Sequence, residues 1–112
     1  MASRRAALPA RHEVPAVDAH ALEAARRCDL MLTEARARGL DRWVAYLVPL
    51  PDRLRDDPLP ALRAAARRLR AAYGPQDSIR DALPAELTEP ARDAVDRLLR
   101  ELDRLALGHV DG

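Results

Sequence analysis

Hydrophobic residues recur with the period of an α-helix in three long segments of the chain. In residues 18–38 the repeating apolar positions are Ala21, Ala25, Cys28, Leu32 and Ala35. A second apolar face consists of Leu59, Leu62, Ala65, Ala66, Leu69, Ala72 and Tyr73. A third consists of Ala91, Val95, Leu98, Leu99, Leu102 and Leu105. Because runs of β-branched residues are almost absent, the pattern predicts an all-α fold, a small helical bundle of three long helices plus two short helical segments.

Capping residues and prolines predict the ends of the first two long helices. Asp18 can cap the first helix, and Gly39 is a suitable left-handed stop after it. Asp56 or Asp57, followed by Pro58, has the acid-then-proline order of a helix start. The second long helix is therefore expected to begin near Pro58.

A short aromatic segment follows the first helix. Asp41 can cap it, and its bulky apolar residues have helical spacing: Trp43, Tyr46, Leu47 and Leu50. Pro49 and Pro51 are expected to end it, which makes residues 51–60 a connector. We expect Trp43 to anchor the core, with a ligand platform as the alternative.

A structured turn is predicted between the second and third long helices. Gly74, with Pro75 behind it, is the expected left-handed stop. Ser78 has the position of an N-cap and Asp81 that of a capping-box acid, which predicts the second short helical segment. We expect Gly74, Ser78 and Asp81 to be structural and to hold the flanking helices at a fixed angle.

The last helix is expected to start at Thr88 or Glu89, with Pro90 in its first turn, and to end at Gly108. Its apolar residues keep a heptad-like rhythm over barely three heptads. That length is more often part of an internal core, but it is also compatible with a homodimer through this helix.

Composition and charge limit the classes of function. The 112 residues fit one domain, with residues 16–112 as the helical domain and the proline-interrupted residues 1–15 as a mobile N-terminal arm. All 19 basic side chains are arginine, and 18 acids leave a net charge of +1. The absence of Lys, Asn and Phe is typical of a GC-rich bacterial genome. A charge this balanced argues against a nucleic-acid partner.

The expected compartment follows from the cysteine count and from the apolar runs. A single cysteine, Cys28, allows no internal disulfide and fits a reducing cytoplasm. No apolar run approaches the roughly 20 residues of a membrane span. Pro9 interrupts the apolar residues after Arg4 and Arg5, so no signal-peptide core is present. We expect a cytoplasmic protein that does not bind a membrane.

Few residues could carry chemistry. His20 and Glu23 share a helix face and could be half of a metal site, but no second pair of this kind exists. Cys28 and His20 are eight residues apart, about 12 Å along a helix, which is too far for a nucleophile–base pair. We therefore expect no catalytic residues, no metal and no cofactor, and a protein that is not an enzyme.

Three arginines on the second long helix form the one feature that favours a function. Arg63, Arg67 and Arg70 fall within about 60° of each other on its flank, and no acid occurs between Asp57 and Asp77. The acid-rich last helix could neutralise this stripe within the fold. The alternative is that the stripe binds a partner, because the planar arginine side chain suits protein interfaces.

Residues 73–83, Tyr-Gly-Pro-Gln-Asp-Ser-Ile-Arg-Asp-Ala-Leu, resemble the signature of a small uncharacterised bacterial helical family. That family has a Gly-Gly-x-Gly-Ser-x-x-Asp-Leu turn between two helices, with a Trp in a helix upstream. The residues that match in place are Gly74, Ser78, Asp81 and Trp43. Pro75 and Asp77 replace the second and third glycines. The resemblance covers about the last two-thirds of the chain and implies an immunity or antitoxin-like role.

Taken together, the residues favour a non-catalytic module that binds another protein, which on this resemblance would be a toxin. The alternative is a small DNA-binding or transcription-accessory protein. A third and more distant class is an enzyme that uses Cys28 or His20.

Overall fold

The computed structural model describes residues 8–111, and every regular element among them is helical. A 3-10 turn, η2 (Arg11–Glu13), precedes six α-helices: α1 (Pro15–Ala37), α2 (Asp41–Leu47), α3 (Leu50–Asp56), α4 (Leu59–Ala71), α5 (Ile79–Ala82) and α6 (Ala85–Asp111). The predicted all-α fold with three long helices is confirmed. There is one more short helix than predicted.

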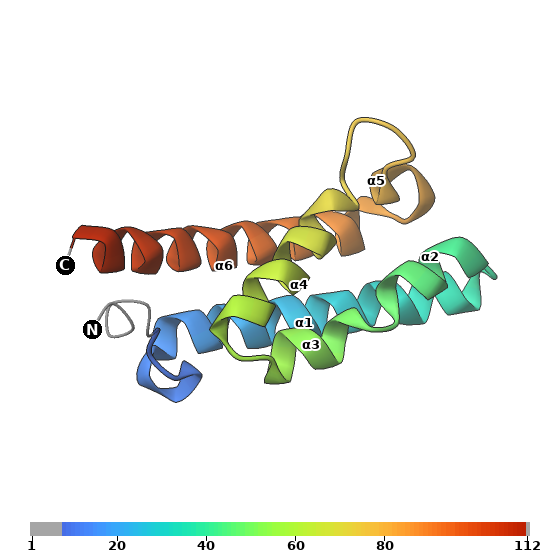
Figure 1. The fold of residues 1–112 in the computed structure, drawn as a ribbon. Helices are drawn as coiled ribbons and strands as arrows, with labels where there is room; N and C mark the ends of the chain where they lie inside the picture. The colour runs from blue at the N-terminus through green and yellow to red at the C-terminus, as the bar shows by residue number, and fades with distance from the viewer. Residues whose placement is uncertain (1–7, 112) are drawn as a thin grey trace.

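The first and last helices form the base of the fold. α1 and α6 lie side by side and antiparallel, and their contact is the most extensive between any two elements (Figure 1). α4 crosses this pair and packs against α6, while α2 and α3 run along α1 (Figure 1). α5 and the turn before it lie at the same end of the molecule as α2 (Figure 1).

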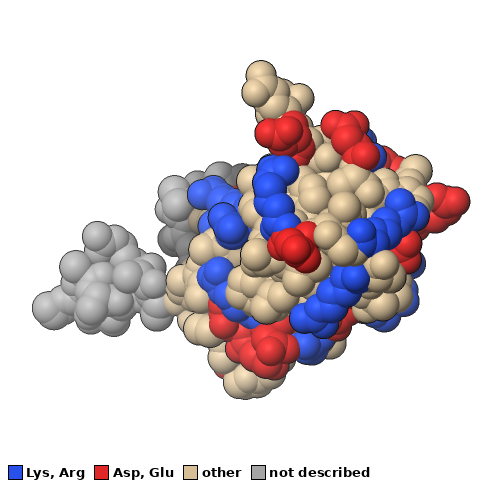
Figure 2. All heavy atoms as spheres, turned by 90° about the vertical axis from the view of Figure 1, so that its right-hand side faces the viewer, with Lys and Arg blue, Asp and Glu red and all other residues tan. Residues whose placement is uncertain are grey.

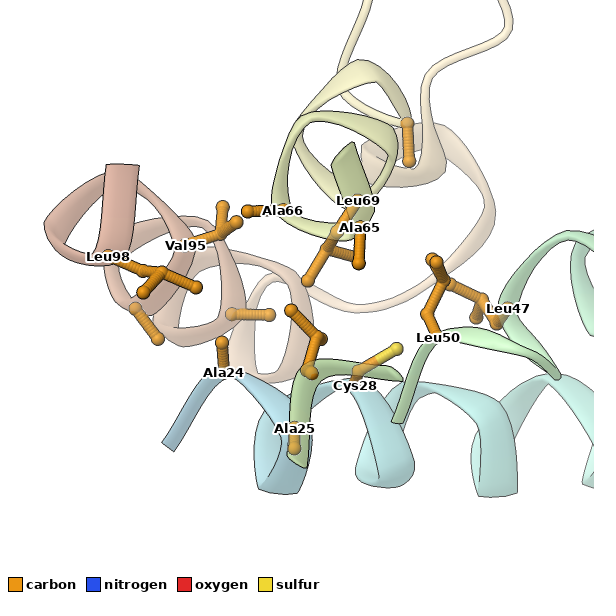
Figure 3. Close-up of a cluster of buried hydrophobic side chains, with 14 of the residues drawn as sticks. Ala24, Ala25, Cys28, Leu47, Leu50, Ala65, Ala66, Leu69, Val95 and Leu98 are labelled. Atoms are coloured by element: carbon orange, nitrogen blue, oxygen red, sulfur yellow. The ribbon is translucent and has the colours of Figure 1, made fainter. Parts of the chain in front are cut away.

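Small side chains let α1 approach its neighbours closely. Ala24, Ala25 and Cys28 are buried, and they lie beneath apolar side chains from α2, α3, α4 and α6 (Figure 3). On α6, Val95 and Leu98 are fully buried in the same cluster (Figure 3). The predicted core-facing stripe of the first helix is confirmed, and Cys28 is one of its buried residues.

The first helix begins four residues earlier than predicted. Its N-cap is Val14 and its first residue is Pro15, so the predicted cap at Asp18 is wrong. Proline fits the first helical position because the N–H it lacks would have no intrahelical partner there. Asp18 instead lies in the first turn, where it accepts a hydrogen bond from Nε of Arg11 at 2.9 Å.

Arg11 connects the segment before α1 to the end of α3. Its Nη1 donates to the carbonyl of Asp57 at 3.0 Å, and its side chain is only 11% exposed. The predicted mobile arm, residues 1–15, therefore includes a residue that is held by two helices. Residues 1–7 of that arm lie outside the described residues.

A helix occupies part of the segment predicted to be a connector. The prediction for residues 51–60 is wrong because α3 forms there. Pro51 takes the second helical position, where no N–H is needed. Leu50 and Leu54, one turn apart, are fully buried, and α3 packs against α1. Burial of these two leucines outweighs the proline content of the segment.

The starts of α2 and α4 differ slightly from prediction. Leu40 rather than Asp41 is the N-cap of α2, and Pro58 rather than Asp56 or Asp57 is the N-cap of α4. Asp57 instead ends α3. Trp43 is 7% exposed, which confirms it as a core residue.

Gly39 ends α1 as predicted. Its φ is +68°, in the left-handed region that glycine adopts without a steric penalty. Its N–H donates to the carbonyl of Arg36 at 3.1 Å, and the N–H of Leu40 donates to the carbonyl of Ala35 at 2.9 Å. These two bonds form a Schellman motif.

The turn after α4 is built differently. Gly74 is not in the left-handed region, so this part of the prediction is wrong, and Asp77 has the positive φ, +52°. The end of α4 tightens into i→i−3 hydrogen bonds, which removes the need for a left-handed residue. Ser78 is confirmed as a cap, because its Oγ accepts from the N–H of Arg80 at 3.1 Å. Asp81 is exposed and forms no capping box with the described residues.

The last helix begins earlier and ends later than predicted. The carbonyl of Pro84 accepts from the N–H groups of Leu87 and Thr88, which starts α6 at Ala85. The predicted cap at Thr88 or Glu89 is therefore wrong, and Pro90 lies inside the helix. The backbone also stays helical through Gly108, the predicted stop, to Asp111.

Candidate functional site

Two of the three arginines in the predicted stripe face α6. Nε of Arg70 donates to Oδ1 of Asp96 at 2.7 Å, and Nη1 of Arg63 donates to Oδ1 of Asp103 at 2.5 Å. The two aspartates are seven residues apart on α6, so they lie on the same side of that helix. The structure therefore places Arg63 and Arg70 in the α4–α6 seam, which is the internal alternative considered from the sequence.

The third arginine of the stripe has a different environment. Arg67 is exposed and makes no ion pair with any described residue. Its neighbours on the outer surface of α4, Ala64 and Arg68, are also exposed. Of the predicted partner-binding residues, Arg67 is thus the one with a free guanidinium in the described part of the chain.

Tyr46 connects α2 to the C-terminal end of α4. Its hydroxyl donates to the carbonyl of Arg68 at 2.6 Å. Carbonyls in the last turn of a helix have no intrahelical N–H to bind, so this bond satisfies one of them. The guanidinium of Arg68 lies over the ring of Tyr46, with its central carbon 4.1 Å from the ring centroid.

A second arginine lies over an aromatic ring on α2. The guanidinium carbon of Arg42 is 4.8 Å from the centroid of the Trp43 ring. Trp43 and Tyr46 pack edge to face with centroids 5.4 Å apart. We refer to Arg42, Trp43, Tyr46 and Arg68 as the arginine–aromatic face. It has a guanidinium at each end and two aromatic rings between them.

The arginine–aromatic face as a whole was not predicted as a site, although a ligand platform on Trp43 was the alternative to its role in the core. The spacing of Trp43 and Tyr46 marks them as neighbours on one helix. The approach of Arg68 depends on how α2 and α4 cross, and no local pattern encodes that crossing. The one signal available was an arginine directly before Trp43, which is common in a chain with 19 arginines.

Arg42 and Arg68 of this face, and Arg67 beside them, differ from most other arginines of the described chain, because they make no ion pair with a described residue. Arginines that do are Arg11, Arg26, Arg27, Arg38, Arg53, Arg55, Arg63, Arg70, Arg80, Arg92 and Arg104. At the end of the molecule that carries α2 and α5, arginine and acidic side chains are interspersed (Figure 2). A broad basic surface suited to a phosphate backbone is not visible there.

An apolar groove lies at the opposite end of the molecule. It has a volume of about 570 Å³ between the start of α1 and the later turns of α6. Its lining residues are Glu13, Val14, Pro15, Ala16, Val17, Glu101, Arg104 and Leu105. Three of these lining residues are charged. Glu101 and Arg104 form an ion pair with each other at 2.7 Å. Glu13 accepts a hydrogen bond through its Oε1 from the N–H of Ala10.

A smaller polar hollow of about 210 Å³ lies farther along the α1–α6 seam. It contains His20 and Glu23, the pair considered as half of a metal site, together with Asp93 from α6. Glu23 is bound to Arg26 and Arg27, whose hydrogen bonds lower the pKa of its carboxyl group. Among the described residues, no group of three or more His, Cys, Asp or Glu side chains is arranged to hold a metal ion.

The candidate nucleophile and base do not meet. Cys28 is fully buried, and burial raises the pKa of its thiol to about 12. His20 lies in the polar hollow facing α6 instead. A thiol with so high a pKa is almost entirely protonated at neutral pH and is a poor nucleophile.

The heptad face of α6 is occupied within the fold. Of its residues, Ala91, Val95, Leu98 and Leu102 are at most 3% exposed. Leu99 and Leu105 are partly buried against the same core. A homodimer that used this face would have to displace α1 or α4, so the described structure favours the internal-core alternative.

Comparisons with protein-family models, curated proteins and solved structures found no match to this chain. The resemblance of residues 73–83 to a bacterial family therefore stays a prediction. In the part of the chain that the structure describes, no helix combines the length and the apolar character needed to cross a bilayer.

Proposed function

We propose that this chain is a non-catalytic module that binds another protein in the cytoplasm, and that the outer surface of α4 around Arg67 is part of the contact. The observation that carries the proposal is the exposure of Arg67 without an ion-pair partner in the described chain, beside Arg68, which is also exposed. Arginine is enriched at the energetically important centres of protein interfaces, because its planar group makes paired hydrogen bonds to carboxylates.

The more specific form of this proposal is an immunity or antitoxin-like role. It is supported by the match of Gly74, Ser78, Asp81 and Trp43 to the family pattern, and by no site chemistry. The alternative remains a small DNA-binding or transcription-accessory protein. The net charge of +1 and the ion pairs of Arg63 and Arg70 to α6 both disfavour it.

The proposal can be tested by separating binding from stability. Tagged chains carrying Arg67→Gln or Arg70→Gln would be used to capture proteins from the native host, with quantitative mass spectrometry of the captured proteins. We expect Arg67→Gln to reduce capture of a partner several-fold with an unchanged melting temperature. Arg70→Gln should lower the melting temperature and leave capture intact, because its guanidinium is bound to Asp96.

Two outcomes would contradict the proposal. One is that no protein is enriched by the wild-type chain over an unrelated helical protein of equal charge. The other is that Arg67→Gln captures the same proteins in the same amounts. Retention on double-stranded DNA that falls steeply with salt concentration would instead support the DNA-binding alternative.

A further inference from the structure

We propose that the partner contact extends from α4 onto α2, and that the arginine–aromatic face binds an acidic segment of the partner, rich in Asp or Glu. This inference rests on the proposed function and names the chemistry of the partner. The residues that would receive the carboxylates are Arg42 and Arg68, and Arg67 lies beside them on α4.

The geometry holds both guanidinium groups in place before binding. Arg68 is stacked at 4.1 Å on Tyr46, and Arg42 at 4.8 Å on Trp43. Trp43 is buried, and Tyr46 is fixed by its hydrogen bond to α4, so neither ring is free to reorient. An arginine that is already ordered loses less conformational entropy when it binds, which favours affinity. A stacked guanidinium still has its N–H edge available for a carboxylate.

The exposed surface of α2 supplies an apolar floor beside these cations. Arg42, Ala45, Tyr46 and Pro49 are spaced as one face of a helix, and all except the half-buried Tyr46 are exposed. Val48, at the end of α2, is 46% exposed. Aromatic and aliphatic contact area flanked by arginine is the composition typical of interface centres. The partner segment is therefore expected to carry apolar side chains among its acids.

Charge complementarity selects carboxylates over other ligands. The guanidinium groups of Arg42, Arg67 and Arg68 lack an anionic partner in the described chain, although most of its other arginines have one. A phosphate backbone would need an extended basic surface, whereas arginine and acidic side chains are interspersed at this end of the molecule (Figure 2). A short acidic segment needs only the few cations present here.

The test uses Trp43, the only tryptophan in the chain, as an internal fluorescent reporter. A glutamate-rich peptide with interspersed leucines would be titrated into the full chain, with the matched glutamine-rich peptide and a DNA duplex as competing probes. We expect saturable binding of the glutamate peptide that weakens as salt increases. Arg42→Gln and Arg68→Gln should each weaken it about three- to tenfold, and the double variant more than tenfold.

Arg26→Gln is the matched control. It removes the same charge from an exposed arginine on α1 that is paired with Glu23, so peptide affinity should stay within about twofold of the wild type. Circular dichroism of each variant separates loss of binding from loss of fold.

Three results would overturn the inference: no binding of the glutamate peptide, equal affinity of Arg42→Gln/Arg68→Gln and wild type, or tighter binding of the DNA duplex. The proposed function is tested separately by capture from the native host. A partner that is lost with Arg67→Gln but retained by Arg42→Gln/Arg68→Gln would refute the acidic-segment inference and leave the proposed function standing.

Discussion

Two tyrosines near the end of α4 make the same kinds of contact in different surroundings: each hydroxyl donates to a backbone carbonyl, and each ring lies near an arginine. Tyr46 donates its hydroxyl to the carbonyl of Arg68, and an arginine covers its ring at the surface. Tyr73 donates its hydroxyl to the carbonyl of Thr88 at 2.7 Å, and the guanidinium of Arg70 lies 5.7 Å from its ring centroid. Tyr73 is buried, and burial raises the pKa of its hydroxyl, so the group remains a donor.

The difference lies in whether the arginine beside each ring has an acidic partner. Arg70, beside Tyr73, is committed to Asp96 on α6, and this arrangement joins α4 to the core. Arg68, beside Tyr46, has no acid to bind in the described chain, and its guanidinium remains available. An arginine near an aromatic ring is therefore not a functional signal in itself. The signal is that such an arginine has no carboxylate within the described chain to form an ion pair with.

The largest expected effect tests the buried member of the pair. Tyr73→Phe leaves the carbonyl of Thr88 without this partner inside the protein, and we expect it to lower the free energy of unfolding by about 1–3 kcal/mol. Tyr46→Phe removes a similar bond near solvent, where water can replace it, and should cost about 0.5–1 kcal/mol. Urea denaturation of both variants measures the difference. Equal losses would mean that the two arrangements do not differ as described.

The next effect distinguishes the two kinds of arginine. Arg70→Gln should lower the free energy of unfolding by about 0.5–1 kcal/mol, because its ion pair with Asp96 is only partly exposed. Arg67→Gln should change it by less than about 0.5 kcal/mol. A double-mutant cycle with Asp96→Asn isolates the pair, and a coupling energy near zero would contradict a stabilising α4–α6 seam.

Acid should weaken the Tyr73 side of α4 selectively. Arg80 lies near the Tyr73 ring and binds Glu89 on α6, and its hydrogen bonds hold the pKa of Glu89 below its ordinary value. The carboxyl group of Glu89 therefore binds a proton more readily in the unfolded chain than in the folded one. Its contribution to the free energy of unfolding is present at neutral pH and is lost as the pH falls below about 4.3. The melting temperatures of wild type and Arg80→Gln should therefore converge in acid. A constant difference between them from pH 7 to pH 3 would refute this.

The smallest expected effect concerns Cys28, whose buried thiol should not react with a labelling reagent in the folded protein. Because burial raises the pKa of Cys28 to about 12, a thiol reagent at neutral pH should label it only in unfolded molecules. Tyr73→Phe should speed labelling more than Tyr46→Phe, in proportion to its larger loss of stability. Rapid labelling of the native wild type would show that Cys28 is accessible.

Periodicity predicted the long helices well because each has a face that must be buried. The alanine stripe of α1 and the leucines of α4 and α6 are in the core. Gly39 and Ser78 were also predictable, because a left-handed stop and a serine cap act within a few residues of their own position. Local chemistry of this kind can be read without knowing the tertiary fold.

The errors came from prolines and from contacts between distant segments. Pro51 was predicted to end a helix and Pro90 to lie in the first turn of one, but Pro51 occupies an early helical position and α6 begins before Pro90. Helical angle placed the three arginines of the stripe on one flank of α4. Angle alone could not show that Asp96 and Asp103 lie opposite Arg70 and Arg63. For the same reason, the contact between Tyr46 and Arg68 is not encoded by any local pattern.

The pairing of α1 with α6 also has a consequence for how the chain acquires its structure. Among the α-helices of the described chain, α1 is synthesised before the others, and its most extensive contact is with α6, which is synthesised after them (Figure 1). Until α6 has left the ribosome, one side of the alanine face of α1 has nothing to cover it. Contacts between sequence-distant segments slow folding, because the loop between them must close before they contribute. The native bundle therefore forms after translation of α6, and a nascent chain that stops before Ala91 should remain sensitive to proteases.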